Sequence, residues 1–212
     1  MKLVKICGLN DAAGFDAAVE HGADFLGFVF FAKSPRNVTP AQAATLSARS
    51  PGGPLRVALV VDADDAALDA IHASLRPDLW QLHGAETPAR SAAIRTRFGL
   101  PVMKALGIAS AADLDACAAY APVVDRFLLD AKPPADAALP GGNALSFDWA
   151  LLAGRAIPRP WLLAGGLDAG NVAEAMRISA APGVDVSSGV ERARGVKDPA
   201  RIAAFIKAAR AA

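Results

Sequence analysis

Two side chains that could move protons end two hydrophobic runs that lie far apart in the sequence. Cys7 closes the run KLVKIC, and Asp130 closes the run DRFLLD. A thiol acts as a base once its pKa falls from about 8.5, so that the thiolate is accessible near neutral pH. A nearby positive charge such as Lys5 could lower that pKa. A carboxyl group that holds its proton can act as the matching general acid.

Each of these residues also has a structural alternative. Most free cysteines are small buried hydrophobic residues, and Cys117, within an alanine-rich stretch, is interpreted in that way. Taken alone, Cys7 would also be interpreted as structural, and its position at the end of a hydrophobic run, together with its context KICG, favours a catalytic role. For Asp130, a role as a loop cap stays open on the residues alone.

Further polar residues follow the ends of neighbouring runs. Arg36 lies in a loop after the second run, where its guanidinium could bind a carboxylate bidentately or be a solvated surface group. Asp185 could accept hydrogen bonds from hydroxyl or N–H groups of a ligand or form a salt bridge at the rim. Gln81 and His83, in the stretch WQLHG, are expected to line the same pocket, although a lone histidine more often has a structural partner.

Two short segments near the end of the chain favour phosphate binding. Gly165 and Gly166 let the backbone approach a ligand closely. The residues Ser187, Ser188 and Gly189 begin the stretch SSGVE, which could open a short helix whose N–H groups bind an anion. The alternative is that the glycines serve tight turns.

A repeating order of elements must position these groups. Hydrophobic runs predict eight buried strands, at residues 2–7, 24–30, 55–61, 78–82, 101–106, 125–130, 160–164 and 183–186. Amphipathic stretches between them predict helices at 11–21, 40–48, 65–75, 88–98, 111–119, 171–178 and 199–211. The order predicts an α/β protein, a single (β/α)8 TIM barrel covering residues 1–212, with its site at the carboxyl ends of the strands. The segment 131–146 is interpreted as an active-site loop.

The main architectural alternative is a doubly wound open sheet. Such sheets usually have five to seven strands, and no GxGxxG motif follows the first run, which weakens the dinucleotide-binding version.

Composition excludes several classes of function. The chain has 212 residues, a hydrophobic fraction of 53% and a formal net charge of +1, so no nucleic acid or membrane surface is expected as a partner. Its two cysteines lack metal-binding spacing, which predicts no metal site and favours a reducing compartment. No apolar stretch approaches the length of a membrane span, about 20 residues, and a cytoplasmic location is expected.

At these residues the sequence resembles the phosphoribosylanthranilate isomerase family. The matching stretches are KICGLN, GFVFFAKSPRNVTP, LWQLHGAE, FLLDAK, PGGNALSFDW, LLAGGLDAGNVAEA and GVDVSSGVERARGVKDP. The resemblance implies a cofactor-free Amadori rearrangement of N-(5-phosphoribosyl)anthranilate in tryptophan biosynthesis, with Cys7 as the base and Asp130 as the acid. The chain departs from the family pattern at VALVVDAD, where Asp62 stands in the place of a common asparagine, and at LDAG.

Other functions remain to be weighed against this one. A related phosphosugar barrel, such as an indole-glycerol-phosphate synthase or a ribulose-phosphate epimerase, would need a catalytic lysine pattern or metal ligands at several strand ends. A barrel that only binds phosphate, as a sensor or scaffold, would have lost one of the proton-transfer residues. The expected partner is a small phosphorylated substrate, and the chain is expected to be a monomer or a homodimer.

Overall fold

Eight parallel strands close into a barrel in the computed structural model, which describes residues 2–132 and 146–212. The strands are β1 Leu3–Cys7, β2 Phe25–Phe30, β3 Leu55–Val60, β4 Leu79–Leu82, β5 Val102–Ile108, β6 Arg126–Ala131, β7 Trp161–Leu163 and β8 Gly183–Val186. The first strand pairs with both β2 and β8, which closes the ring. The predicted (β/α)8 barrel is therefore confirmed, and the open-sheet alternative is excluded.

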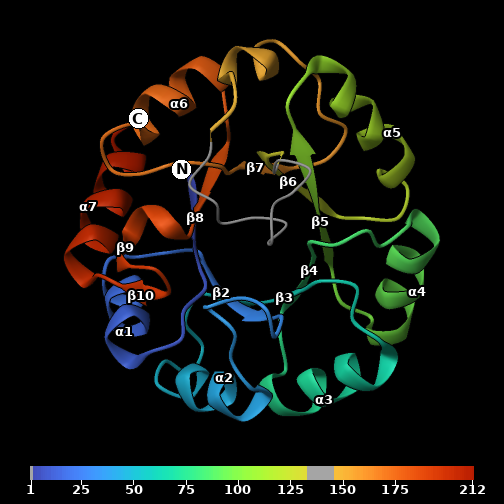
Figure 1. Ribbon diagram of the computed structural model, residues 1–212, viewed down its shortest axis with the longest axis vertical. Coiled ribbons are helices and arrows are strands. Elements are labelled where there is room, and N and C mark those ends of the chain that lie inside the picture. The colour runs from blue at the N-terminus through green and yellow to red at the C-terminus, as the bar shows by residue number, and fades with distance from the viewer. Residues whose placement is uncertain (1, 133–145) are drawn as a thin grey trace.

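Helices surround the strands in an outer layer (Figure 1). The α-helices are α1 Ala12–Glu20, α2 Pro40–Ser47, α3 Asp65–Leu75, α4 Pro88–Phe98, α5 Ala116–Tyr120, α6 Val172–Ser179 and α7 Pro199–Arg210. The predicted starts of α4 and α7 are confirmed, because Thr87 and Asp198 accept hydrogen bonds from first-turn N–H groups and each is followed by proline.

In the part of the chain that the structure describes, three short 3₁₀ helices accompany them: η1 Ala111–Asp115, η2 Trp149–Leu152 and η3 Ser188–Val190. The single helix predicted over 111–119 is wrong in its first half. There Asp113 accepts hydrogen bonds from the backbone N–H groups of Ala109 and Ser110, which favours the tight turn of η1. After η3 the chain forms a small hairpin that was not predicted, with β9 Glu191–Ala193 antiparallel to β10 Val196–Lys197. Most of the predicted active-site loop, residues 133–145, lies outside the described residues.

The barrel interior has an apolar lower layer and an upper layer that contains polar side chains as well as the apolar Val29 and Leu59. Side chains two residues apart on a strand point to the same face. The lower layer is a buried cluster of Phe25, Val57, Leu79, Met103, Ala105, Leu128, Leu162 and Ala164. Gln81 follows Leu79 by two residues and Asp130 follows Leu128 by two, so the same faces become polar toward the carboxyl ends of the strands. The polar mouth thus rests on a packed apolar base.

Candidate active site

Cys7 lies at the mouth of the barrel and has a buried lysine as its neighbour. Cys7 is the last residue of β1, and it is 4% exposed. Lys5, two residues earlier on the same face, is 0% exposed, and its Nζ lies 2.7 Å from Oδ1 of Asp185. The pairing of β1 with β8 sets this contact, because Lys5 and Asp185 are direct partners in the register.

A glycine on the next strand makes room for both side chains. A Cβ atom at Gly27 of β2 would lie 3.0 Å from Sγ of Cys7 and 3.1 Å from Nζ of Lys5. The thiol and the ammonium therefore share the space that this glycine leaves open. From the sequence, Lys5 is expected only as a positive charge near Cys7. The signal that both side chains face the barrel interior is their spacing of two residues on one strand.

Burial and charge act in opposite directions on this pair. Burial raises the pKa of the Cys7 thiol, and the ammonium of Lys5 opposes that rise without cancelling it. Burial lowers the pKa of Lys5, but the negative charges of Asp185 and of the thiolate outweigh burial and raise it. The lowered pKa expected of Cys7 is therefore not found, and the balance of burial and charge favours a thiol at Cys7 and an ammonium at Lys5.

The carboxyl group of Asp130 lies at the end of β6, where the described residues give it two polar neighbours. Its Oδ1 accepts a hydrogen bond of 2.8 Å from the N–H of Ala131, and Nε2 of His83 lies 3.5 Å from its Oδ2. Nε2 of Gln81 lies 3.1 Å from Nδ1 of His83. An amide nitrogen only donates, so in this arrangement Nδ1 accepts and the imidazole proton faces Asp130. Oε1 of Gln81 is buried without a partner among the described residues.

Arg36 is buried in a salt bridge that was not predicted. Its Nε lies 2.6 Å from Oε1 of Glu191, and its Nη2 lies 2.9 Å from Oε2. Nζ of Lys197 lies 2.9 Å from the same Oε1. The bidentate carboxylate partner of Arg36 in this structure is thus internal, rather than the substrate carboxylate that the sequence suggested. Neither Glu191 nor Lys197 was singled out in the sequence, because their meeting depends on the unpredicted hairpin.

The charges in this cluster fix the ionisation of Glu191. Burial raises the pKa of its carboxyl group, but the hydrogen bond from Arg36 and the charge of Lys197 outweigh burial and lower the pKa from 4.5 to about 2. Burial lowers the pKa of Lys197, and the charge of Glu191 opposes this.

The two segments predicted to bind phosphate lie against each other. Gly165 and Gly166 have φ angles of 89° and 62°, which glycine adopts readily. A Cβ atom at Gly189 would lie 1.9 Å from the carbonyl oxygen of Leu167, so the loops after β7 and β8 are in direct contact. The predicted helix after Ser187 is confirmed only as the single 3₁₀ turn η3, since Glu191 already begins β9.

These loops also contact the two proton-transfer candidates. A Cβ atom at Gly165 would lie 3.1 Å from Oδ1 of Asp130. Oγ of Ser187 donates a hydrogen bond of 3.1 Å to the carbonyl oxygen of Cys7, and Nζ of Lys197 donates one of 2.9 Å to the carbonyl oxygen of Ser187. The ends of β1, β6, β7 and β8 therefore form one continuous polar surface, with Ser188 half-buried beside it.

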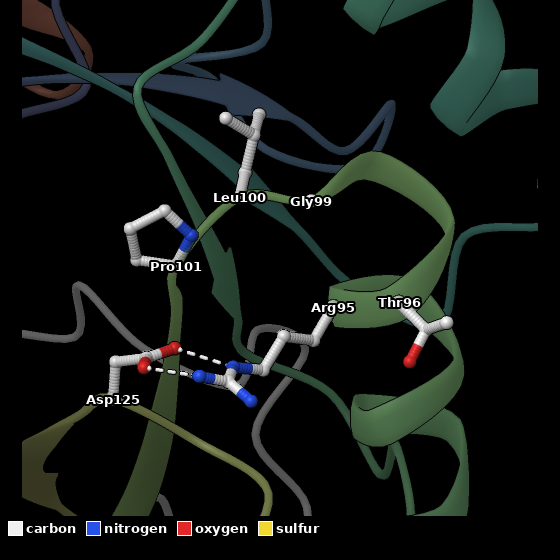
Figure 2. A pocket seen from close by; sticks show the side chains of 6 residues that line it. All are labelled: Arg95, Thr96, Gly99, Leu100, Pro101 and Asp125. Carbon is white, nitrogen blue, oxygen red and sulfur yellow. Dashed lines mark hydrogen bonds and ion pairs between the residues drawn. The ribbon is translucent and has the colours of Figure 1, made fainter.

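A pocket at the other end of the molecule is unrelated to this surface. Figure 2 shows Arg95 of α4 reaching Asp125, which precedes β6. The lining residues are Arg95, Thr96, Gly99, Leu100, Pro101 and Asp125. They lie where β5 and β6 begin, and barrel enzymes build their sites at the opposite ends of the strands. Within residues 2–132 and 146–212 there is no cluster of three or more metal-ligating side chains, and no helix is long and apolar enough to cross a membrane.

Comparison with known proteins identifies the family. A family model described as N-(5'phosphoribosyl)anthranilate (PRA) isomerase matches residues 4–208. The chain belongs to the phosphoribosylanthranilate isomerase family, and it is an isomerase. It is 63% identical to the N-(5'-phosphoribosyl)anthranilate isomerase of Paracoccus denitrificans, covering 98% of this chain and 97% of that relative. The corresponding protein of Rhodospirillum rubrum is 59% identical, with 98% and 97% covered.

Solved structures of this family share the whole fold. The phosphoribosyl anthranilate isomerase of Thermotoga maritima has a TM-score of 0.89 at 35% identity, with 100% of both chains covered. A second structure, with a TM-score of 0.86 at 32% identity and full coverage of both chains, is a phosphoribosyl anthranilate isomerase in complex with reduced 1-(o-carboxyphenylamino)-1-deoxyribulose 5-phosphate.

Proposed function

We propose that the chain converts N-(5-phosphoribosyl)anthranilate to 1-(2-carboxyphenylamino)-1-deoxyribulose 5-phosphate by an Amadori rearrangement, as a step of tryptophan biosynthesis. The supporting observation is the convergence of Cys7, Asp130 and the two glycine-containing loops on one barrel mouth. The reaction consists of proton transfers within one substrate, so it needs no cofactor. We place it in the reducing cytoplasm, where the two buried cysteines stay free thiols.

Ring opening is the first step, and Asp130 is the proposed general acid. Its proton goes to the ring oxygen of the ribose as the bond between that oxygen and C1 breaks. The lone pair of the anthranilate nitrogen forms the C1=N bond, which leaves a protonated imine. His83, with its imidazole proton toward Asp130, is proposed to hold the carboxyl group in position.

Proton removal from C2 is the second step, and Cys7 is the proposed general base. The C2–H bond breaks, its proton goes to the thiolate, and its electron pair forms a C1=C2 bond while the π pair of the C1=N bond returns to nitrogen, which gives an enolamine. The hydroxyl group on C2 then loses its proton and C1 gains a proton, which gives the ketone. Base catalysis of this kind contributes about 10²–10⁴-fold to the rate.

The remaining groups are proposed to bind the substrate. Its phosphate is placed at the loops that carry Gly165, Gly166, Ser187, Ser188 and Gly189. Arg36, Gln81, His83 and Asp185 are proposed to line the rest of the pocket, with Arg36 on the side of the anthranilate carboxylate as a positive charge, since its Nε and Nη2 are already paired with Glu191. Arg36 and Asp185 are already fixed in buried ion pairs, with Glu191 and Lys5, so their orientation is set before the substrate binds.

Substrate fluorescence provides a direct test. Phosphoribosylanthranilate is fluorescent, and when it is generated in situ its emission should decay rapidly after the protein is added. The Cys7→Ala variant serves as the matched control for added protein. A decay rate that is the same with the wild type, with the control and without protein would reject the proposed activity.

A further inference from the structure

A fully buried lysine inside the barrel is the feature that the proposed reaction does not yet use. Lys5 is 0% exposed, and its side chain rises through the interior toward the mouth. The interior of such a barrel is normally filled with branched apolar residues. Burying an ammonium group is costly unless it is paired, and replacing a buried ion pair by apolar residues is often neutral or stabilising. Packing alone therefore does not account for a lysine at this position.

The surroundings of Lys5 direct its ammonium toward the thiol. Asp185 holds Nζ at 2.7 Å from the β8 side, opposite Lys5 in the strand register. On the β2 side the missing side chain of Gly27 leaves a space whose Cβ position is 3.1 Å from Nζ and 3.0 Å from Sγ of Cys7. One carboxylate therefore anchors the ammonium, and one glycine lets it approach the sulfur.

The charged groups around Cys7 come from three strands. Lys5 lies on β1, Asp185 on β8 and Lys197 on β10, while β2 presents the glycine. Burial raises the pKa of the thiol, Lys5 opposes this most strongly, Asp185 adds to the rise, and Lys197 opposes it more weakly. The two cations thus act against burial, and Lys5 is the stronger of them.

We propose that Lys5 is the positioning residue of the base, because its ammonium, anchored by Asp185, is the counter-ion of the Cys7 thiolate that removes the C2 proton. This inference rests on the proposed function. The thiol first loses its proton to solvent, and the thiolate then takes the proton from C2 and becomes a thiol again. Lys5 keeps its three protons throughout, so it stabilises the charge without acting as a base.

Titration of the thiol tests this without any substrate. Thiolate absorbance near 240 nm is followed against pH in a Cys117→Ser background, with Cys7→Ser in the same background as the blank. An opposite charge within about 4–6 Å shifts a pKa by about 1–3 units. We expect the Lys5→Met variant to raise the midpoint of Cys7 by at least about 1 pH unit. An unchanged or lowered midpoint would overturn the proposal.

A second variant covers the case in which Lys5→Met does not fold because Asp185 is left unpaired. The double variant Lys5→Met/Asp185→Asn removes both charges together, and its midpoint is also expected above that of the wild type, since the effect of Lys5 exceeds that of Asp185. The matched control is Lys104→Met/Glu86→Gln, which removes an equally buried ion pair of 2.8 Å from another part of the barrel. The control should leave the midpoint of Cys7 in place, and an equal shift there would reject a specific role for Lys5.

The pH profile of kcat/KM tests whether Lys5 affects catalysis through the ionisation of Cys7. In Lys5→Met the acidic limb should move upward by the same amount as the thiol midpoint, with a loss of about 10–10³-fold near neutral pH that recovers at alkaline pH. A loss that is equal at every pH would indicate a structural role only and would overturn the proposal. Absence of isomerase activity in the wild type would reject the proposed function, while the thiol titration would still report on the ion pair.

Discussion

The two sides of the barrel mouth are built on different physical principles. On the β1–β8 side, Cys7 lies among fixed charges, with the Lys5–Asp185 pair beside it and Lys197 nearby. On the β4–β6 side, the neighbours of Asp130 among residues 2–132 and 146–212 are one imidazole at 3.5 Å and a backbone N–H. A buried thiol needs cations before it can become a thiolate. A carboxyl group that must hold a proton is better left without a fixed cation, so the asymmetry follows from the two proposed tasks.

Removing the proposed base or acid should give the largest effect. Cys7→Ala and Asp130→Asn are each expected to lower kcat by about 10²–10⁴-fold, because each removes one proton-transfer group. Steady-state kinetics with fluorescent substrate measures the loss, and far-UV circular dichroism checks that the fold is kept. Wild-type kcat/KM in either variant would contradict the role assigned to that residue.

Loss of a charge on the β1–β8 side of the mouth should also lower the free energy of unfolding. Glu191→Gln removes the anion that neutralises Arg36 and Lys197, and we expect the free energy of unfolding at pH 7 to fall by about 3 kcal/mol. The folded-state pKa of Glu191 is lowered from 4.5 to about 2. Its contribution is therefore fully present above about pH 4.5 and is lost as the pH falls toward 2.

Urea unfolding at a series of pH values measures this contribution. The wild type should lose stability between about pH 4.5 and 2, and the difference between wild type and Glu191→Gln should shrink over that interval. The exposed pair of Asp16 and Arg49, whose side chains are 48% and 45% exposed, provides a control. Asp16→Asn should show little effect at pH 7. A constant difference between wild type and Glu191→Gln at all pH values would contradict the assigned linkage.

On the side of the mouth that carries Asp130, catalysis should depend on which ring nitrogen of His83 carries the proton. Gln81→Glu replaces the amide donor by an acceptor, so Nδ1 of His83 would carry the proton and Nε2 would no longer offer one to Asp130. We expect kcat/KM to fall about tenfold, the equivalent of one hydrogen bond. Gln81→Met should cause a smaller loss of kcat/KM, because methionine places no strong acceptor beside Nδ1 of His83. Equal losses in the two variants would argue against a role for the tautomer.

The smallest effect is expected at the pocket of Figure 2, far from the mouth. Arg95→Ala breaks an exposed ion pair with Asp125. Such pairs contribute little, so the urea midpoint and kcat should stay close to those of the wild type. A clear loss of kcat would show that the two ends of the barrel are coupled.

The strand order and the inward direction of the mouth residues could be predicted from the sequence. Hydrophobic runs mark all eight strands, and the spacing of Gln81 and His83 from Leu79 places them on one interior face. The ion pairs could not be predicted, because they depend on which strands meet. Lys5 and Asp185 are 180 positions apart and meet only through barrel closure. Glu191 finds Arg36 through a hairpin whose short strands carry no clear hydrophobic signal.

Closure of the ring between its first and last strands has a consequence for synthesis of the protein. Cys7 is synthesised well before its charged neighbours Asp185 and Lys197, which lie far later in the sequence. A nascent chain that has folded its early strands carries Lys5 but still lacks Asp185, which pairs with Lys5, and Lys197. The sulfur of Cys7 therefore acquires its finished environment only after Lys197 has been synthesised and has packed against the barrel.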